Sequence, residues 1–210
     1  MAAVKPGGGP AADLLDVLRR PVLEAAPRLL GATFTHAGVT LRLTEVEAYD
    51  GADDPGSHAH KGRTCRNKVM FGPPGHLYVY FTYGMHHCCN VACGPEGRAS
   101  AILLRAGEVV DGLDTARARR PRSSDRDLAR GPGRLCKALG IDREDNGLDL
   151  SQVLRLGPSL DDISTGPRVG LRLAADRPWR FWIPGDPTVS RYVAAKPKPR
   201  PEARTRQPRR

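Results

Sequence analysis

Apolar and polar residues alternate with a period of two along several stretches of the chain, which predicts β-strands. Residues 32–49 are expected to form two strands joined at Ala37-Gly38, and residues 77–82 and 85–93 a hairpin that turns at Tyr83-Gly84. Further strands are expected at 100–106, 169–173 and 179–183. Helices are expected at 21–31, 111–120 and 133–139; Pro21 suits a first helical position, and Gly31 and Gly140 suit C-terminal caps.

These strands and helices form separate groups, without an alternation of strand and helix. Such grouping predicts an α+β fold, in which one domain has a mostly antiparallel curved sheet, flanking helices and a protruding β-hairpin. We expect this domain to span residues 13–193. A disordered N-terminus at 1–12 and a disordered, basic, proline-rich tail at 194–210 would flank it.

The net charge of +10 is concentrated in two segments. Residues 196–210 contain seven Lys or Arg and one Glu, and residues 117–134 contain seven Arg and two Asp. A single run of this kind is usually a solvated surface. Two runs in a chain of 210 residues favour a polyanionic partner, and nucleic acid is the natural candidate.

Composition narrows the class of protein further. The sequence is 40% hydrophobic and 27% charged, without an apolar run long enough to span a membrane and without an apolar segment near the N-terminus typical of a secretory signal. The five cysteines are then expected to be reduced thiols, so we expect an intracellular protein. No G-x-G-x-x-G or Walker motif is present, and no nucleotide cofactor is expected.

The segment from Leu41 to Tyr49 contains the first candidate chemistry. Regular alternation would place Leu41, Leu43, Glu45, Glu47 and Tyr49 on one face of a strand. A glutamate desolvated in a cleft beside a tyrosine ring can serve as a general base. Two solvated glutamates near a strand end are the commoner arrangement for such a segment taken alone.

The segment from Leu77 to Met85 is rich in tyrosine. Tyr78 and Tyr80 would share a strand face, where sheet packing is the ordinary role, especially for Tyr78. Tyr83 would lie at the hairpin tip, where an aromatic side chain can wedge between base pairs. Arg105 ends an apolar strand and could orient a carboxylate.

The segment from Met85 to Cys93 contains two histidines and three cysteines. A zinc site on His87, Cys89 and Cys93 is one alternative, but adjacent residues of a strand point to opposite faces and no C-x-x-C pair is present. Buried cysteines that pack as small apolar residues are favoured, and no metal is expected. Asn90 is a polar residue in an apolar strand and needs a hydrogen-bond partner.

Several short motifs, in this order and spacing, resemble the monofunctional, mammalian-type alkyladenine (3-methyladenine) DNA glycosylase family, which also has bacterial members. The similarity runs from about Pro21 to Ser190. The matching stretches are Thr44-Glu-Val-Glu-Ala-Tyr49, Arg66-Asn67 with Met70-Phe71, Gly75-His-Leu-Tyr-Val-Tyr80, Tyr83-Gly84-Met85, Leu103-Leu-Arg105, Gly131-Pro132 with Leu135-Cys136, and Arg168-Val-Gly170.

The resemblance implies a role for each matching residue. Glu47 would be the general base that activates water, Arg105 would help to hold that water and the carboxylate, and the backbone carbonyl of Val169 would contact the same water. Tyr49 and Tyr80 would sandwich a flipped base, with His58 completing the pocket by a hydrogen bond. Asn90 would exclude guanine, and Tyr83 would fill the gap left in the duplex.

The resemblance therefore implies a DNA base-excision repair enzyme that hydrolyses the N-glycosidic bond of alkylated or deaminated purines, such as 3-methyladenine, hypoxanthine or ethenoadenine. It implies base flipping, attack by water and no lyase step. The expected partner is double-stranded DNA with damaged purines, bound by a monomer without a cofactor. The alternative is a non-catalytic, basic nucleic-acid-binding module in which Glu47 is structural.

Overall fold

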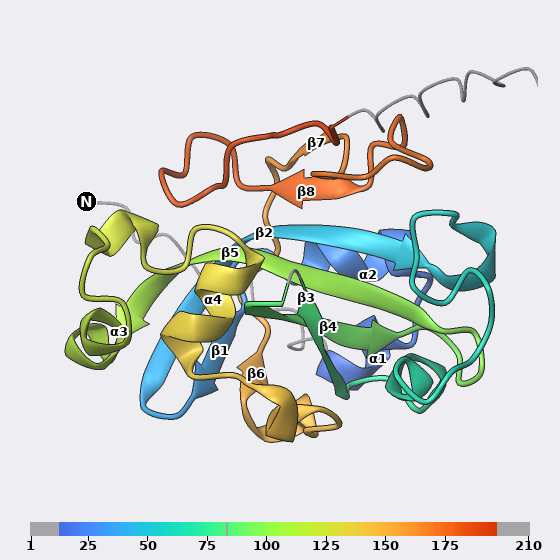
Figure 1. Ribbon diagram of the computed structural model, residues 1–210, viewed down its shortest axis with the longest axis horizontal. Coiled ribbons are helices and arrows are strands. Elements are labelled where there is room, and N and C mark those ends of the chain that lie inside the picture. Colours follow the sequence, from blue (N-terminus) through green and yellow to red (C-terminus); the bar gives the residue numbers. More distant parts are fainter. Residues whose placement is uncertain (1–12, 83, 197–210) are drawn as a thin grey trace, which may run out of the picture.

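The computed structural model describes residues 13–82 and 84–196 (Figure 1). The helices in this part are α1 (Leu14–Leu18), α2 (Val22–Arg28), α3 (Leu113–Arg119) and α4 (Pro132–Leu139). The strands are β1 (Thr33–His36), β2 (Val39–Asp50), β3 (Leu77–Thr82), β4 (His86–Cys93), β5 (Ser100–Asp111), β6 (Leu154–Arg155), β7 (Ser164–Gly166) and β8 (Arg180–Trp182). Short 3-10 turns include η1 (Gly51–Asp53), η2 (Lys68–Phe71), η3 (Asp125–Asp127), η4 (Arg143–Asp145) and η5 (Leu150–Gln152).

Strand β2 is the centre of one antiparallel sheet. One edge of β2 pairs with β5 along most of its length, and the other edge pairs first with β1 and then with β8. The sheet continues from β5 through β4 to β3, from β1 to β6 and from β8 to β7. In Figure 1, β7 and β8 lie above β2, and α1 and α2 lie behind the sheet. The predicted α+β fold with an antiparallel sheet is confirmed.

The pairing of β2 with β5 is irregular where the outer partner of β2 changes from β1 to β8. Leu43 pairs with Gly107 and Val46 pairs with Leu104, but between these pairs Thr44 has no partner on β5 and Arg105 has no partner on β2. A bulge of this kind bends a strand and shifts the alternation of its side chains. Two bulges therefore lie side by side in the middle of the sheet.

The bulge corrects one expectation from the sequence. Leu41 and Leu43 face the main core before the bulge, and Val46 and Ala48 face it afterwards. The predicted single face of two leucines, two glutamates and a tyrosine is therefore wrong, because the extra residue moves the glutamates away from the leucine side. Both glutamates are nevertheless fully buried, so the expectation of two solvated side chains is also wrong.

The main core collects apolar side chains from α1, α2 and α4 and from one face of the sheet, including Cys89 and Cys93. A smaller cluster lies on the other face of β3 and β5, around Tyr78, Met70 and Ala101. The two clusters give β3, β4 and β5 two buried faces, which explains why these strands show little polar alternation in the sequence.

The helices agree with the sequence in kind and differ in extent. Helix α4 begins at Pro132 and is capped by Gly140, whose φ of 72° is in the left-handed region that favours glycine. Pro21 is the N-cap of α2 and not its first helical residue. Helix α1 was not predicted; the carboxylate of Asp13 caps it by accepting a hydrogen bond from the N–H of Leu15 at 3.2 Å. The longest described helix has eight residues, and none could cross a membrane.

One predicted strand is absent from the described part of the chain. Residues 169–173 form a turn, because Gly170 has a φ of 73° and its N–H donates to the carbonyl of Val193 instead of to a neighbouring strand. The two hairpins at 32–49 and 77–93 and the strand at 179–183 are confirmed, the last as the shorter β8. Strand β5 runs five residues further than predicted, to Asp111.

Candidate active site

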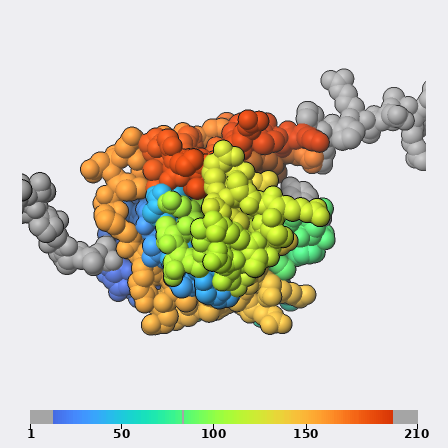
Figure 2. Space-filling model, turned by 90° about the vertical axis from the view of Figure 1, so that its left-hand side faces the viewer, coloured from blue at the N-terminus to red at the C-terminus, as the bar shows by residue number. Residues whose placement is uncertain are grey.

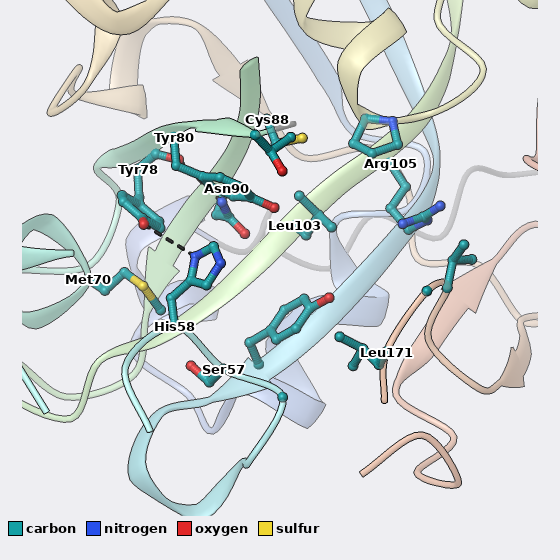
Figure 3. Close-up of a pocket in the computed structure, with 16 residues that line it drawn as sticks. Ser57, His58, Met70, Tyr78, Tyr80, Cys88, Asn90, Leu103, Arg105 and Leu171 are labelled. Carbon is teal, nitrogen blue, oxygen red and sulfur yellow. Dashed lines mark hydrogen bonds between the residues drawn. The ribbon is translucent and has the colours of Figure 1, made fainter. Parts of the chain in front are cut away.

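A cavity of about 410 Å³ opens between the β3–β4 hairpin, β5, the loop after β2 and the segment at 169–171 (Figure 3). This volume lies within the range of about 300–1,000 Å³ typical of small-molecule sites. Its lining is Tyr49, Gly56, Ser57, His58, Met70, Tyr78, Tyr80, Thr82, Cys88, Asn90, Leu103, Arg105, Pro132, Val169, Gly170 and Leu171. Most residues to which the resemblance gives a role therefore surround one cavity, although each comes from a different segment of the chain.

Glu47 lies immediately behind this lining. Its Oε1 accepts a hydrogen bond from the N–H of Val169 at 2.7 Å and lies 3.3 Å from a guanidinium nitrogen of Arg105, and its Oε2 accepts from the hydroxyl of Tyr49 at 2.8 Å. Each of these three partners lines the cavity. The carboxylate is fully buried, so its contacts within the described residues are these protein groups at the cavity wall.

Val169 contributes its amide to this arrangement. The resemblance implies a role for its carbonyl, whereas the contact within the described residues is made by its N–H. Both backbone groups belong to one residue in the turn that replaced the predicted strand. The turn therefore supplies a backbone donor to the Glu47 carboxylate.

Arg105 lies at the β5 bulge and joins two carboxylates. Its Nε donates to Glu45 at 2.7 Å, while its other end reaches Glu47. Burial opposes the charge of Arg105, but the carboxylates of Glu47 and Glu45 outweigh burial and raise its pKa. Arg105 is therefore a permanent cation on the wall of the cavity.

Two tyrosines form apolar walls with protonated hydroxyls. Burial and then the Glu47 carboxylate raise the pKa of Tyr49 well above its usual value, and burial and then the Cys88 thiol raise the pKa of Tyr80. The ring of Tyr80 stacks on that of Tyr78 with centroids 5.6 Å apart. Flat rings in the lining of a cavity favour a planar aromatic ligand.

His58 meets the edge of this wall as a neutral ring. Its imidazole packs edge-on against Tyr80 at 4.6 Å, and its Nδ1 lies 3.3 Å from the hydroxyl of Tyr78, the dashed contact in Figure 3. Burial and then the charge of Arg66 lower its pKa, so the imidazole is uncharged near neutral pH. With Nδ1 engaged by Tyr78, Nε2 is available to a ligand.

Asn90 has the partner that the sequence required. Its side-chain amide donates to the carbonyl of Tyr78 at 3.3 Å across the hairpin, which directs the remaining polar atoms toward the cavity. Tyr83, the predicted intercalating residue, lies outside the described residues. Its neighbours Phe81 and Met85 are 50% and 67% exposed.

In the sequence, Arg168 stood out only as part of a short motif. In the structure, its side chain supports the part of the cavity wall that contains Tyr49. Its guanidinium is fully buried, binds Asp54 through two nitrogens at 2.5 and 2.8 Å and donates to the carbonyl of Ala48 at 2.9 Å. It also lies 4.6 Å from the centroid of Tyr49 and 5.1 Å from that of Trp179. The only signal in the sequence was the motif Arg168-Val-Gly170, which overlaps the strand expected at 169–173.

The cysteines do not converge on a metal site in the described part of the chain. Cys89 and Cys93 belong to the main core, whereas Cys88 lines the cavity. Within residues 13–82 and 84–196, no group of three or more His, Cys, Asp or Glu is arranged to hold an ion. The zinc alternative on His87, Cys89 and Cys93 therefore has no geometric support there.

The arginine-rich run at 117–134 is held largely by internal contacts. Five of its seven arginines bind carboxylates or backbone carbonyls of the protein: Arg117, Arg119, Arg120, Arg126 and Arg130. Arg122 and Arg134 are exposed and have no such partner among the described residues. Figure 2 shows this segment, in yellow-green, as a raised surface next to the last described part of the chain, in red.

The comparisons with known proteins agree with one another. The family model of methylpurine-DNA glycosylase matches residues 16–187. Three similar relatives are each provisionally named as a 3-methyladenine DNA glycosylase. The protein of Nocardia farcinica is 56% identical and covers 80% of this chain and 85% of its own length. That of Streptomyces avermitilis is 54% identical and covers 88% and 93%. That of Frankia casuarinae is 48% identical and covers 96% and 99%.

These matches include every segment that surrounds the cavity, from Glu47 to Leu171. They confirm the resemblance inferred from the short motifs and identify the protein as a DNA glycosylase of base-excision repair. The chain belongs to the methylpurine-DNA glycosylase family.

Proposed function

We propose that this protein excises alkylated or deaminated purines, of the 3-methyladenine, hypoxanthine and ethenoadenine class, from double-stranded DNA. Excision hydrolyses the N-glycosidic bond of a base that has been flipped out of the helix. The observation that carries the proposal is the position of the buried Glu47 carboxylate directly behind Tyr49, Arg105 and Val169 at the wall of an aromatic cavity.

The chemistry needs a base and a stabilised cation in one place. Cleavage of an N-glycosidic bond passes through an oxocarbenium-like sugar, as it does in glycosidases. A carboxylate beside the sugar can both balance that charge and take a proton from the attacking water. Arg105 and Val169 orient Glu47 toward the cavity, and water would attack where these two residues meet the lining.

The cavity suits a flipped purine. Such a base loses its stacking in the duplex, and stacking on aromatic side chains returns roughly 1–3 kcal/mol per base. Tyr49 and Tyr80 supply those faces, His58 supplies a polar edge, and Asn90 narrows the pocket against the 2-amino group of guanine. Tyr83 would occupy the vacated position in the duplex.

The first experiment measures base release from duplexes that each contain one modified purine. We expect abasic sites, detected as heat-labile breaks, in hypoxanthine-containing duplex and none in unmodified duplex. A protein that binds such duplexes and releases no base would instead be the non-catalytic binding module.

A Glu47→Gln variant tests the assignment of the base. Glutamine keeps the size of the side chain and cannot accept a proton, so we expect duplex binding to persist and the rate of excision to fall about 10²–10⁴-fold. An Asp142→Asn variant, which changes an exposed carboxylate in η4's cap, is the matched control and should retain the full rate. A fully active Glu47→Gln protein would remove Glu47 from the mechanism.

The proposal includes hydrolysis without a lyase step. A lyase would need an amine that attacks the sugar, and among the described residues no lysine lines the cavity. Treatment of the reaction with borohydride should therefore trap no covalent protein–DNA adduct, and a trapped adduct would overturn this part of the proposal.

We expect the protein to act as a monomer inside the cell and without a cofactor. The five thiols are unpaired, and only Cys65 is exposed, which suits a reducing compartment. The basic tail at 194–210, most of it outside the described residues, is proposed to contact DNA phosphates. Its removal should then lower the slope of the salt dependence of binding by about 0.9 for each phosphate that the tail neutralises.

A further inference from the structure

A second buried carboxylate, that of Glu45, lies next to the proposed general base, Glu47. It accepts four hydrogen bonds from the protein. Its oxygens accept hydrogen bonds from Nε of Arg105 at 2.7 Å and from Nε of Arg180 at 2.7 Å. They also accept from the N–H of Ser190 at 2.6 Å and from its hydroxyl at 2.9 Å. Strands β2, β5 and β8 and the C-terminal segment therefore meet at this one side chain.

The cluster of Glu45, Glu47, Arg105 and Arg180 contains two negative and two positive charges, all buried. Burying ions is costly, and replacing a buried ion cluster by apolar residues is often neutral or stabilising. Stability therefore gives little reason to keep four charges here. Their place, in contact with the proposed base and with the wall of the cavity, gives a functional one.

The two carboxylates contact different ends of the Arg105 guanidinium. Glu45 binds Arg105 at Nε, so only the far end of the guanidinium is left for Glu47, at the longer distance of 3.3 Å. Arg180 donates hydrogen bonds to Glu45 and to the carbonyl of Ser190. Without the charge of Glu45, Glu47 would be the only carboxylate left in this cluster, and it is the direct ion-pair partner of Arg105.

We infer that Glu45 is a positioning residue, which anchors Arg105 and balances the charge of the two cations beside Glu47. This inference rests on the proposed function. Burial opposes the charge of Glu45, but Arg105, Arg180 and the Ser190 N–H outweigh burial and lower its pKa.

The other titratable groups that face the cluster stay neutral. They are Tyr49 from β2, Tyr80 from β3 and Cys88 from β4, and burial is the main cause that raises the pKa of each, to about 11 for Cys88. A further buried cation, Arg168, is already paired with Asp54. His58 lines the same cavity, and burial and the charge of Arg66 lower its pKa, but it is unchanged in every variant. A displacement of the pH–rate profile that follows the charge at position 45 or 180 would therefore report this cluster.

The test compares variants that remove one charge of the cluster, or one of each sign. The rate of single-turnover excision of hypoxanthine from duplex DNA is measured for each variant between pH 5 and 9. Glu45→Gln removes a negative charge, so the acidic limb should move to lower pH by about one unit. Because a weaker base accepts the proton less readily, the plateau rate should fall roughly three- to tenfold, with the Kd for the duplex unchanged.

Arg180→Gln removes a positive charge and should move the limb to higher pH. The double variant Glu45→Gln/Arg180→Gln restores the balance and should return the limb close to that of the wild type. Ser190→Ala is the matched control, because it removes a hydrogen bond to Glu45 without changing any charge, and its limb should not move.

Circular dichroism and thermal unfolding establish that each variant is folded; if Glu45→Gln does not fold, the upward shift in Arg180→Gln carries the test. If Glu45 has a purely structural role, Glu45→Gln should lower the excision rate at every pH without displacing the pH–rate profile. The double variant should then have the lowest excision rate of all. This result would overturn the inference. A wild-type protein that releases no base would overturn the proposed function and the inference together. An active wild type with unshifted variants would overturn the inference alone.

Discussion

Glu47 uses both carboxylate oxygens as acceptors within the protein, and the donors differ in kind. Oε1 faces a guanidinium and the backbone N–H of Val169, and no change of the Val169 side chain would remove that N–H. Oε2 faces only the hydroxyl of Tyr49 among the described residues. Tyr49 therefore has two separable parts: a ring that lines the cavity and a hydroxyl that donates a hydrogen bond to Glu47.

Replacing Tyr49 by Phe separates these parts. The variant removes the hydrogen bond from the hydroxyl to Glu47 and keeps the ring. A hydrogen bond to a charged group contributes about 1.5–3 kcal/mol, so we expect the rate of excision to fall roughly tenfold or more, while the affinity for a hypoxanthine duplex is unchanged. Single-turnover rates and fluorescence binding measure the two quantities.

Tyr49→Leu is the control for the ring. It removes the stacking face as well as the hydroxyl, so the affinity for the flipped base should fall by roughly 1–3 kcal/mol. If Tyr49→Phe weakens duplex binding as much as Tyr49→Leu does, the hydroxyl acts on the DNA substrate and not on Glu47.

At the scale of elements, the pair of Arg168 and Asp54 joins two segments that have no strand pairing with each other. Asp54 follows η1 and also accepts from the N–H of Gly56, at the start of the loop that carries Ser57 and His58 into the cavity. Arg168 precedes Val169, whose N–H holds Glu47. This buried ion pair therefore links the loop that carries His58 to the segment whose Val169 N–H binds Glu47.

An Asp54→Asn variant should lose roughly 3–5 kcal/mol of the free energy of unfolding, because it leaves the buried charge of Arg168 unpaired. Asp53→Asn is the matched control one residue away: its carboxylate is exposed and pairs with the exposed Arg98, so the loss should be at most about 1 kcal/mol. Urea unfolding at pH 7 measures both. Equal losses would mean that the buried pair does not join the two segments.

The contribution of Asp54 should also depend on pH. Burial opposes its charge, but Arg168 outweighs burial and lowers its pKa below the usual value. A carboxyl whose pKa is lowered by folding stabilises the protein above its unfolded pKa of about 3.9, and this stabilisation disappears as the pH falls through the folded value. The difference between wild type and Asp54→Asn should be constant from pH 5 to 7 and shrink below about pH 4.

Across the whole molecule, the distribution of charge changes the meaning of the net charge of +10. The arginine run at 117–134 was expected to contact a polyanion, but most of its guanidinium groups stabilise the surface around α3 and η3. Arg119, for example, donates to the carbonyls of Ala138 and Ala37 and so ties α3 to α4 and to the first hairpin.

This division can be measured by the salt dependence of duplex binding. Arg134→Ala changes an exposed side chain beside the cavity-lining Pro132 and should lower the slope of log K against log salt by up to about 0.9. Arg119→Ala should leave the slope unchanged and lower the melting temperature, because it breaks two internal hydrogen bonds. The reverse pattern would show that the internally bonded arginines are the ones that bind phosphate.

Much of the fold and of the site was accessible from sequence because its signals are local. The turn residues at Ala37-Gly38 and the cap at Gly140 depend on backbone conformation that a few residues determine, and both hairpins and α4 were predicted correctly. The short motifs around Glu47, Tyr80 and Arg105 were enough to identify the family.

The remaining features depend on contacts between distant residues. Nothing near Thr44 indicates that it will lack a partner, because the bulge arises from the pairing of β2 with β5, some sixty residues later in the chain. The same holds for the turn at Gly170, which is held by Val193, and for the partner of Arg168, more than a hundred residues away.

The sequence by itself therefore determined the class of fold, the family and the residues around which chemistry is organised, since periodicity, turn residues and motif order are properties of short segments. Only the tertiary structure decided which side of β2 faces the core, which carboxylate reaches the cavity wall and which cations are already paired. Those outcomes depend on the register of neighbouring strands and on burial, and both exist only once distant segments have packed together.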